Sequence, residues 1–264
     1  MKKLFLIILV AICFTNINAS YAEQIFTTLG QSSDGIIFDG KWTFLQEWKP
    51  TSENIIEFND GHKIAIKTGH DHNNLYVLLD FISEHSFAKF ADFGIVCIDS
   101  NFGKENYPQN DDYCFIASLG SKNPITLDGG SPLGKTNHFT KIKNHPDLIA
   151  VGGISDKNDR YTPVPHTTYE FKIPIEVFGA SDVYGFYVAV YDANVNKIYN
   201  WPQNVVTETF PYVPPPSKWG ELISPDKSIP EFQLPFMAFI PALLLVVYLT
   251  RKIQITFYSK TYKK

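Results

Sequence analysis

Two short segments with apolar side chains, joined by a turn, lie between residues 63 and 81 and set the pattern of the chain. Residues 63–67 alternate polar and apolar side chains with a period of two, which is typical of a strand with one buried face. Residues 69–74 are rich in turn-forming Gly, Asp and Asn, and the apolar run 75–81 follows them. The pattern predicts two strands that run back along each other.

Similar short segments recur along the chain. Further strands are predicted at 93–98, 113–119, 139–142, 148–151, 167–173 and 184–192, with a short helical step at 174–179. Turn residues and polar loops separate them, and a helical period is almost absent. This organisation indicates an all-β fold of the β-sandwich type.

The first 22 residues have the three parts of a secretory signal peptide. Lys2 and Lys3 are basic, the run 4–14 is apolar, and Ser20 and Ala22 supply the small residues at a cleavage site. The apolar run is short for a membrane span, so cleavage after Ala22 is predicted, with an uncleaved N-terminal anchor as the alternative.

The C-terminal end has the pattern of a membrane helix. Residues 233–250 carry no charge, and the tail 251–264 that follows is basic. By the positive-inside rule the tail is cytoplasmic and the preceding domain lies outside the cell. The chain is thereby divided into a signal peptide (1–22), an extracellular domain (23–222), a stalk (223–232), a transmembrane helix (233–250) and a basic tail (251–264).

A short motif, Pro230-Glu231-Phe232, stands just before the predicted helix. Together with the apolar segment and the basic tail, it resembles the PEF-type C-terminal sorting signal of archaeal surface proteins. The resemblance implies a sortase-like membrane enzyme that recognises the tail and exchanges it for a lipid. A helix that stays in the membrane is the alternative, and both readings place the domain at the cell surface.

The domain between the two ends is acidic. Residues 23–229 contain 16 Lys and Arg against 26 Asp and Glu, a formal charge of −10. Such a surface repels phosphates, so neither nucleic acid nor anionic lipid headgroups are expected as partners.

The domain contains two cysteines, Cys97 and Cys114, because Cys13 lies in the predicted signal peptide. Outside the cell two thiols most simply form a disulfide. Both lie in predicted strands on either side of one loop, which favours their pairing.

Several short motifs stand in a fixed order along the domain. They are Phe38–Trp42 followed by Glu47 and Trp48, Asp71–Asp80 with Leu75-Tyr76-Val77 inside it, Cys97–Asp99 with Asp111–Tyr113, Tyr169–Pro174, and Trp219 with Gly220. In this order they resemble the family-9-like carbohydrate-binding domains, which are DOMON-like β-sandwiches, over residues 34–222. The resemblance implies two packed antiparallel sheets, in a superfamily that includes sugar-binding modules and haem-binding electron-transfer domains.

Oxygen-bearing side chains gather in the loop between residues 99 and 112. Asp99 and Asn101 stand at alternate positions, and Asp111 and Asp112 close the same loop. Calcium prefers six to eight oxygen ligands, so a structural calcium is a hypothesis for this loop, and a solvated acidic loop is the alternative. The modules that this domain resembles often carry structural calcium.

The sequence bears on two other cofactors, a transition metal and haem. His70 and His72 flank Asp71 and have the ligand types of a copper or zinc site, although turn formation also explains this segment. The two methionines, Met1 and Met237, lie in the predicted signal peptide and membrane helix, so a Met/His-ligated haem in the domain is excluded and no haem is expected.

Exposed aromatic rings are the usual platforms for sugar rings. We expect Tyr199 and Trp201, in a turn with Gln203, to form the ligand site, and Trp42 and Trp48 to be core residues. No catalytic motif is found, so an enzyme is not expected. The sequence therefore predicts a non-catalytic, surface-anchored module that binds a carbohydrate or another small polar ligand. The alternatives are a structural envelope protein and a metal-binding or redox accessory domain.

Overall fold

The computed structural model describes residues 22–29, 35–130, 139–203, 205 and 211–225. The predicted signal peptide (except Ala22), the Pro230-Glu231-Phe232 motif, the predicted membrane helix and the basic tail lie outside these residues. Within the described ranges, no helix is both long and apolar enough to span a bilayer.

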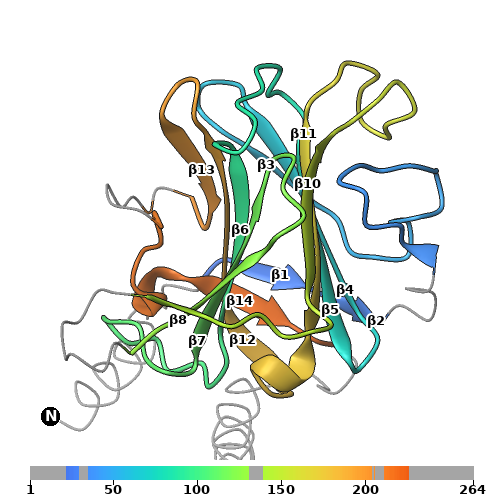
Figure 1. Cartoon of the computed structure of the whole chain (residues 1–264). Coiled ribbons are helices and arrows are strands. Elements are labelled where there is room, and N and C mark those ends of the chain that lie inside the picture. The colour runs from blue at the N-terminus through green and yellow to red at the C-terminus, as the bar shows by residue number, and fades with distance from the viewer. Residues whose placement is uncertain (1–21, 30–34, 131–138, 204, 206–210, 226–264) are drawn as a thin grey trace, which may run out of the picture. The chain divides into compact units, whose positions relative to one another are not determined.

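The described chain forms two β-sheets packed face to face (Figure 1). The larger sheet has the order β1 (Gln24–Phe26), β14 (Gly220–Ile223), β12 (Val183–Asp192), β6 (Phe93–Asp99), β7 (Asp112–Ser118), β8 (Ile125–Asp128) and β9 (Thr140–Ile142), and β13 (Lys197–Trp201) also pairs with β12. The smaller sheet has the order β10 (Ile149–Ile154), β11 (Thr167–Pro174), β5 (Asn74–Phe81), β4 (Lys63–His70) and β2 (Thr28–Leu29), and β3 (Asn54–Glu57) also pairs with β4. Two 3-10 turns, Ile175–Val177 and Pro216–Lys218, complete the described elements.

The predicted hairpin is confirmed as β4 and β5, which pair in antiparallel register. Asp71 shapes its turn, because its Oδ1 accepts hydrogen bonds from the backbone N–H groups of Asn73 and Asn74 at 3.1 and 2.7 Å. The predicted all-β sandwich is confirmed as well. Among the described strand pairs, all but β1–β14 and β2–β4 are antiparallel.

The main core lies between the two sheets. Alternate residues of each strand point inward, as the period of two requires. Those of β5 and β11 meet those of β6, β7 and β12: Val77, Leu79, Phe81, Phe171, Ile173, Val96, Ile98, Phe115, Phe186 and Val188. Each large side chain buried in this way contributes about 1.5–3 kcal/mol, so this layer holds the sandwich together.

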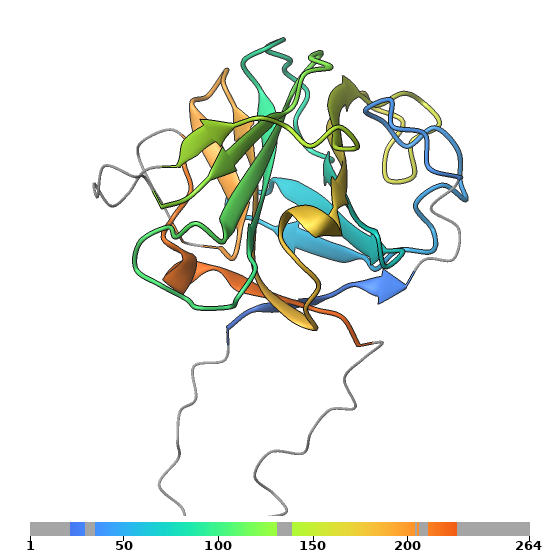
Figure 2. The same cartoon turned by 60° about the horizontal axis from the view of Figure 1, so that its bottom comes forward.

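The N-terminal segment fastens the two sheets to each other. β1 pairs in parallel with β14 of the larger sheet, and β2, two residues further on, pairs in parallel with β4 of the smaller sheet. At the crossing point the N–H of Thr27 still donates to the carbonyl of Ile223 at 2.9 Å. In Figure 2 this blue segment runs along the bottom of the sandwich beside the orange β14.

The predicted disulfide between Cys97 and Cys114 is confirmed. The two residues are direct partners in the β6–β7 register, with their Cα atoms 4.1 Å apart. They lie on the outer face of the larger sheet, in a second apolar cluster with Tyr187 and Trp219.

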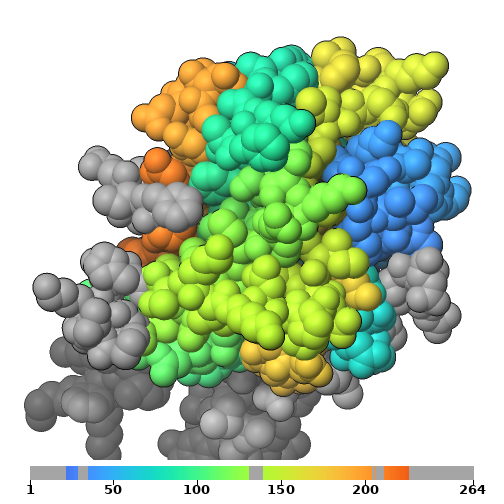
Figure 3. Space-filling model, in the orientation of Figure 1, coloured from blue at the N-terminus to red at the C-terminus, as the bar shows by residue number. Residues whose placement is uncertain are grey.

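Two long loops cover the outer face of the smaller sheet. Residues 35–53 pack Trp42 and Trp48 against Tyr76 and Leu78 of β5, which forms a third apolar cluster. Residues 155–166 lie beside them, and Lys41 Nζ is 3.0 Å from Asp156 Oδ2 across the contact. Figure 3 shows these blue and yellow segments next to each other on one side of the molecule.

Candidate functional site

The loop formed by residues 35–53 is held closed by the carboxylate of Glu47. One oxygen accepts a hydrogen bond from the N–H of Ile37 and the other from the N–H of Thr43, both at 2.7 Å. Gly40 has φ +84°, and a Cβ there would lie 2.5 Å from the backbone nitrogen of Gly153. The loop therefore approaches β10 as closely as the backbone allows, and only glycine fits at its tip.

A second carboxylate, Glu170 of β11, joins the loop to the sheet. Its two oxygens accept hydrogen bonds from the N–H of Gly40 at 2.7 Å and from the indole Nε1 of Trp48 at 3.0 Å. Burial raises the pKa of Glu170 to about 8, and this effect outweighs the two hydrogen bonds, which lower it.

Between the two loops and the sheet lies a cavity of about 330 Å³. Loop 35–53 supplies most of its lining, β4 supplies a lysine, and loop 155–166 supplies an arginine. The lining residues are Trp42, Leu45, Lys49, Thr51, Glu53, Lys67 and Arg160.

The indole of Trp42 and the buried Lys67 form one wall of the cavity, and Tyr161 lies behind the indole. The ring of Trp42 meets that of Tyr161 edge to face at 5.9 Å, and its Nε1 donates to the carbonyl of Phe44 at 2.6 Å. Lys67 Nζ lies 5.3 Å from the centroid of the Trp42 ring, close enough for a cation–π contact.

The carboxylate of Glu53 is the acidic group of the lining. Its Oε2 accepts a hydrogen bond from the hydroxyl of Tyr161 at 2.7 Å and lies 3.2 Å from Lys67 Nζ. These contacts, that of Tyr161 first, lower the pKa of Glu53, whereas burial lowers the pKa of Lys67. With Lys49 and Arg160 the lining has three basic side chains against one acidic one, within a domain that is acidic as a whole.

The residues predicted to stack on a sugar lie elsewhere and are covered. Tyr199 and Trp201 belong to β13 rather than to a turn, and 1% and 4% of their surfaces are exposed. Both are part of the core between the sheets, so the prediction that their rings receive a ligand is corrected. Gln203 donates from its Nε2 to the carbonyl of Glu57 at 2.9 Å.

In the acidic loop, the side chains of two of the four predicted calcium ligands, Asp99 and Asp112, have backbone partners. Asp99 accepts hydrogen bonds from the N–H groups of Gly103 and Lys104, Asp112 accepts one from that of Gln109, and Asn101 is exposed. Burial and the neighbouring acids raise the pKa of Asp112 to about 8. Four buried carboxylate oxygens of this region have no hydrogen-bond partner; they belong to Glu105, Asp111, Asp112 and Asp128.

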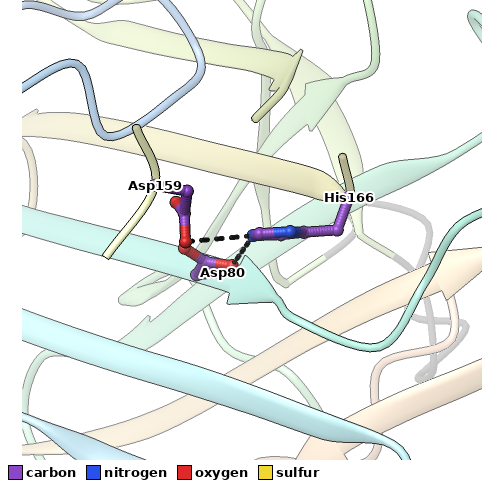
Figure 4. A group of neighbouring side chains, drawn as sticks. All are labelled: Asp80, Asp159 and His166. Atoms are coloured by element: carbon purple, nitrogen blue, oxygen red, sulfur yellow. Dashed lines mark ion pairs between the residues drawn. The ribbon is translucent and has the colours of Figure 1, made fainter. Parts of the chain in front are cut away.

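Across the described residues, three metal-ligand atoms come within 4.8 Å of one another in one group only: Asp80, Asp159 and His166 (Figure 4). None of these three residues is predicted as a site residue from the sequence. Burial raises the pKa of Asp80 to about 6 although His166 lies beside it. Burial lowers the pKa of His166, but Asp80 outweighs this effect and the net shift is upward.

The predicted histidine pair also has other partners. The rings of His70 and His72 lie 5.6 Å apart, and His70 Nε2 is 3.2 Å from the hydroxyl of Ser224. The acidic loop and the histidine pair therefore do not form a three-ligand group with the present side-chain positions.

Comparison with known proteins finds a likeness in structure. No protein-family model matches the sequence, and no curated protein matches it. A family 9 carbohydrate-binding module (CBM9) from Caldicellulosiruptor kristjanssonii, solved in complex with glucose, matches with a TM-score of 0.50 and 17% identity over 78% of this chain and 98% of that one. The same type of module in complex with cellotriose matches with a TM-score of 0.49 and 17% identity, over 76% and 93% of the two chains. The likeness to the glucose complex shows that the fold is that of a CBM9-like sandwich.

Proposed function

We propose that the described domain is a non-catalytic module that binds carbohydrate in the cavity beside Trp42. The observation that carries the proposal is the cavity itself, in which the buried Lys67 pairs with the partly exposed Glu53 next to an indole ring. Its volume of about 330 Å³ is at the lower end of the range of about 300–1,000 Å³ that is common for ligand sites.

The chemistry of the lining suits a sugar. Hydroxyl groups of a sugar both donate and accept hydrogen bonds, and Lys49, Lys67 and Arg160 offer donors while Glu53 offers acceptors. Leu45, which is exposed, supplies apolar surface for the C–H groups of a sugar ring, and the buried Trp42 forms the floor behind it. The CBM9 module with the same fold was solved with glucose bound, which supports this ligand class.

We further propose that the module is displayed on the cell surface. The support is the sequence: a signal peptide at residues 1–22, and a C-terminal apolar segment with basic residues after it. A sortase-like enzyme acting at Pro230-Glu231-Phe232 would replace the helix by a lipid anchor, and either anchor leaves the domain outside.

A glycan array probed with the full-length chain in detergent tests the ligand class. The expected result is a small set of bound oligosaccharides, with reduced signal for Arg160→Ala and unchanged signal for Lys157→Ala, an exposed residue of the same loop. A uniformly negative array would contradict carbohydrate binding. Cross-linking to neighbouring envelope proteins would then favour the structural alternative.

Calcium in the acidic loop stays a separate proposal. The four buried, unpartnered carboxylate oxygens of Glu105, Asp111, Asp112 and Asp128 are suited to a hard cation. A calcium titration of the full chain, followed by thermal unfolding, is expected to raise the Tm of the wild type but not that of Asp112→Asn. Equal shifts in both proteins would contradict it.

A further inference from the structure

A second site lies on the same outer face of the smaller sheet, beneath the loop 155–166. Asp80 is near the end of β5, His166 directly precedes β11, and Asp159 belongs to the loop between β10 and β11. The side chains of all three are completely buried. Figure 4 shows the imidazole directed at the two carboxylates.

The nitrogen and oxygen atoms of this group lie close enough to one another to bind a single metal ion. His166 Nε2 is 2.6 Å from Asp80 Oδ1 and 3.7 Å from Asp159 Oδ1. Asp159 Oδ1 also accepts hydrogen bonds from the N–H groups of Tyr161 and Thr162, at 2.8 and 3.3 Å, which fix this carboxylate in place.

The hydrogen bonds of the other ring nitrogen, Nδ1, determine whether Nε2 is available to bind a metal. His166 Nδ1 is 2.8 Å from the carbonyl oxygen of Val164 and 2.9 Å from the hydroxyl of Ser155. A carbonyl can only accept, so Nδ1 carries a proton, and Nε2 is the nitrogen that a metal would bind in place of a proton. A histidine held through one nitrogen by a backbone carbonyl is the usual arrangement of a metal ligand.

The group also has an excess of negative charge, and several of its oxygen atoms have no hydrogen-bond partner. Two buried carboxylates face one imidazole, and among the described residues no lysine or arginine forms an ion pair with either carboxylate. The Oδ2 atoms of Asp80 and Asp159 are buried without a hydrogen-bond partner. So is the hydroxyl of Thr168, which is the direct register partner of Asp80 on β11. Buried oxygens without a partner lower the stability of the fold unless a cation or an ordered water binds them.

We propose that Asp80, Asp159 and His166 bind a divalent transition metal, with Zn²⁺ the best fit, and that this ion fastens the loop 155–166 to the smaller sheet. One imidazole nitrogen and two carboxylate oxygens suit zinc or manganese, whereas calcium prefers an all-oxygen shell with more ligands. Zinc bonds of about 2.0–2.1 Å place tetrahedral ligands about 3.3 Å apart. The 2.6 and 3.7 Å separations bracket this value, so the side chains need to move by less than about 1 Å.

The proposed ion has a structural role. Its site lies next to the cavity, because both include residues of the loop 155–166. Arg160, which lines the cavity, directly follows Asp159, and Tyr161 donates to Glu53 of the cavity lining. A metal ion that fixes the loop therefore also fixes the side chains of Arg160 and Tyr161 at the cavity. Metal binding itself does not depend on any glycan.

The test uses the full-length chain in detergent, stripped with EDTA and titrated separately with Zn²⁺, Mn²⁺ and Ca²⁺. Bound metal is counted by plasma mass spectrometry and Tm is followed by circular dichroism. We expect one equivalent of tightly bound Zn²⁺ with a rise in Tm, and loss of that equivalent in Asp159→Asn and in His166→Gln.

The matched control is His62→Gln, which removes a histidine 3.1 Å from another aspartate, Asp60, outside the site. This variant is expected to keep its zinc. Asp159→Asn is nearly isosteric and keeps the oxygen that Tyr161 and Thr162 donate to, so it tests the ligand rather than the fold. A milder variant, Ser155→Ala, is expected to weaken zinc binding by about tenfold. The proposal is overturned if the wild type binds no stoichiometric zinc, or if Asp159→Asn and His166→Gln bind it as well as His62→Gln does.

Discussion

Glu170 and Trp48 are 122 positions apart in the sequence, yet the indole Nε1 of Trp48 donates a 3.0 Å hydrogen bond to the Glu170 carboxylate in a fully buried setting. The same carboxylate accepts the N–H of Gly40. One side chain of β11 thus fixes two points, Gly40 and Trp48, of the loop that forms most of the cavity lining.

Replacing Trp48 with phenylalanine removes the indole N–H and leaves one oxygen of Glu170 buried without a partner. Since a buried unsatisfied polar group costs about 1–3 kcal/mol, Trp48→Phe is expected to lose that much of the free energy of unfolding. Urea denaturation measures it. Phe44→Leu, a partly exposed position of the same loop, is the control and is expected to lose much less. Equal losses in the two variants would contradict the role of the hydrogen bond.

The pKa of Glu170 predicts how stability depends on pH. Its value is raised from 4.5 to about 8 in the folded state, so the folded chain binds the proton more tightly than the unfolded chain does. The contribution of Glu170 to stability is therefore complete below pH 4.5 and is lost as pH rises from 4.5 towards 8, with a limiting slope of about 1.4 kcal/mol per pH unit.

Comparison of two proteins isolates this contribution. Free energies of unfolding of the wild type and of Glu170→Gln, measured by urea denaturation from pH 5 to about pH 8, are expected to differ increasingly as the pH rises. The wild type loses stability more steeply because the carboxyl group ionises in the unfolded chain, whereas burial keeps it protonated in the folded chain. Parallel curves would show that Glu170 ionises equally easily in the folded and unfolded chains.

Gly40 and Gly61 form a natural matched pair. Both have positive φ, +84° and +88°, but an added Cβ meets Gly153 at Gly40 and open space at Gly61. Backbone strain of about 1–2 kcal/mol is common to both alanine variants. Gly40→Ala is expected to lose about 1–3 kcal/mol more, since its new methyl group is overpacked. Thermal unfolding of the two variants provides the comparison, and similar Tm values would refute the close approach of the loop to β10.

The disulfide between Cys97 and Cys114 spans a sequence separation of 17, so the loop that it closes is short. Loop-closure entropy for such a loop corresponds to about 3 kcal/mol. The variant with both cysteines replaced by alanine is expected to unfold at a lower Tm by a corresponding amount. Wild type treated with a reductant is expected to approach the Tm of the variant, and no change on reduction would contradict a stabilising role.

Much of the fold follows from local sequence patterns. The β4–β5 hairpin follows from the period of two and the turn that Asp71 shapes, and the disulfide follows from two cysteines beside one loop. These features depend on residues that are close in sequence or in adjacent strands. Local rules of alternation and turn chemistry are therefore sufficient for them.

The sites depend on contacts that local patterns do not encode. Tyr199 and Trp201 look like exposed turn aromatics, but β13 pairs with β12 and turns both rings into the core. Asp80 and His166 come together because Asp80 pairs with Thr168 in the β5–β11 register. Such long-range registers are set by the packing of whole sheets, and a single sequence gives no spacing that reveals them.

Carbohydrate is proposed to bind in the cavity beside Trp42. Calorimetric titration of the strongest glycan-array ligand into three full-length proteins tests it most directly: the wild type, Lys67→Met inside the cavity, and Lys63→Met on the same strand outside it, where the lysine pairs with Glu57. We predict that Lys67→Met weakens binding at least about tenfold, or about 1.4 kcal/mol, while Lys63→Met binds like the wild type. Equal affinities for all three proteins, with folding intact, would contradict the assignment of the cavity.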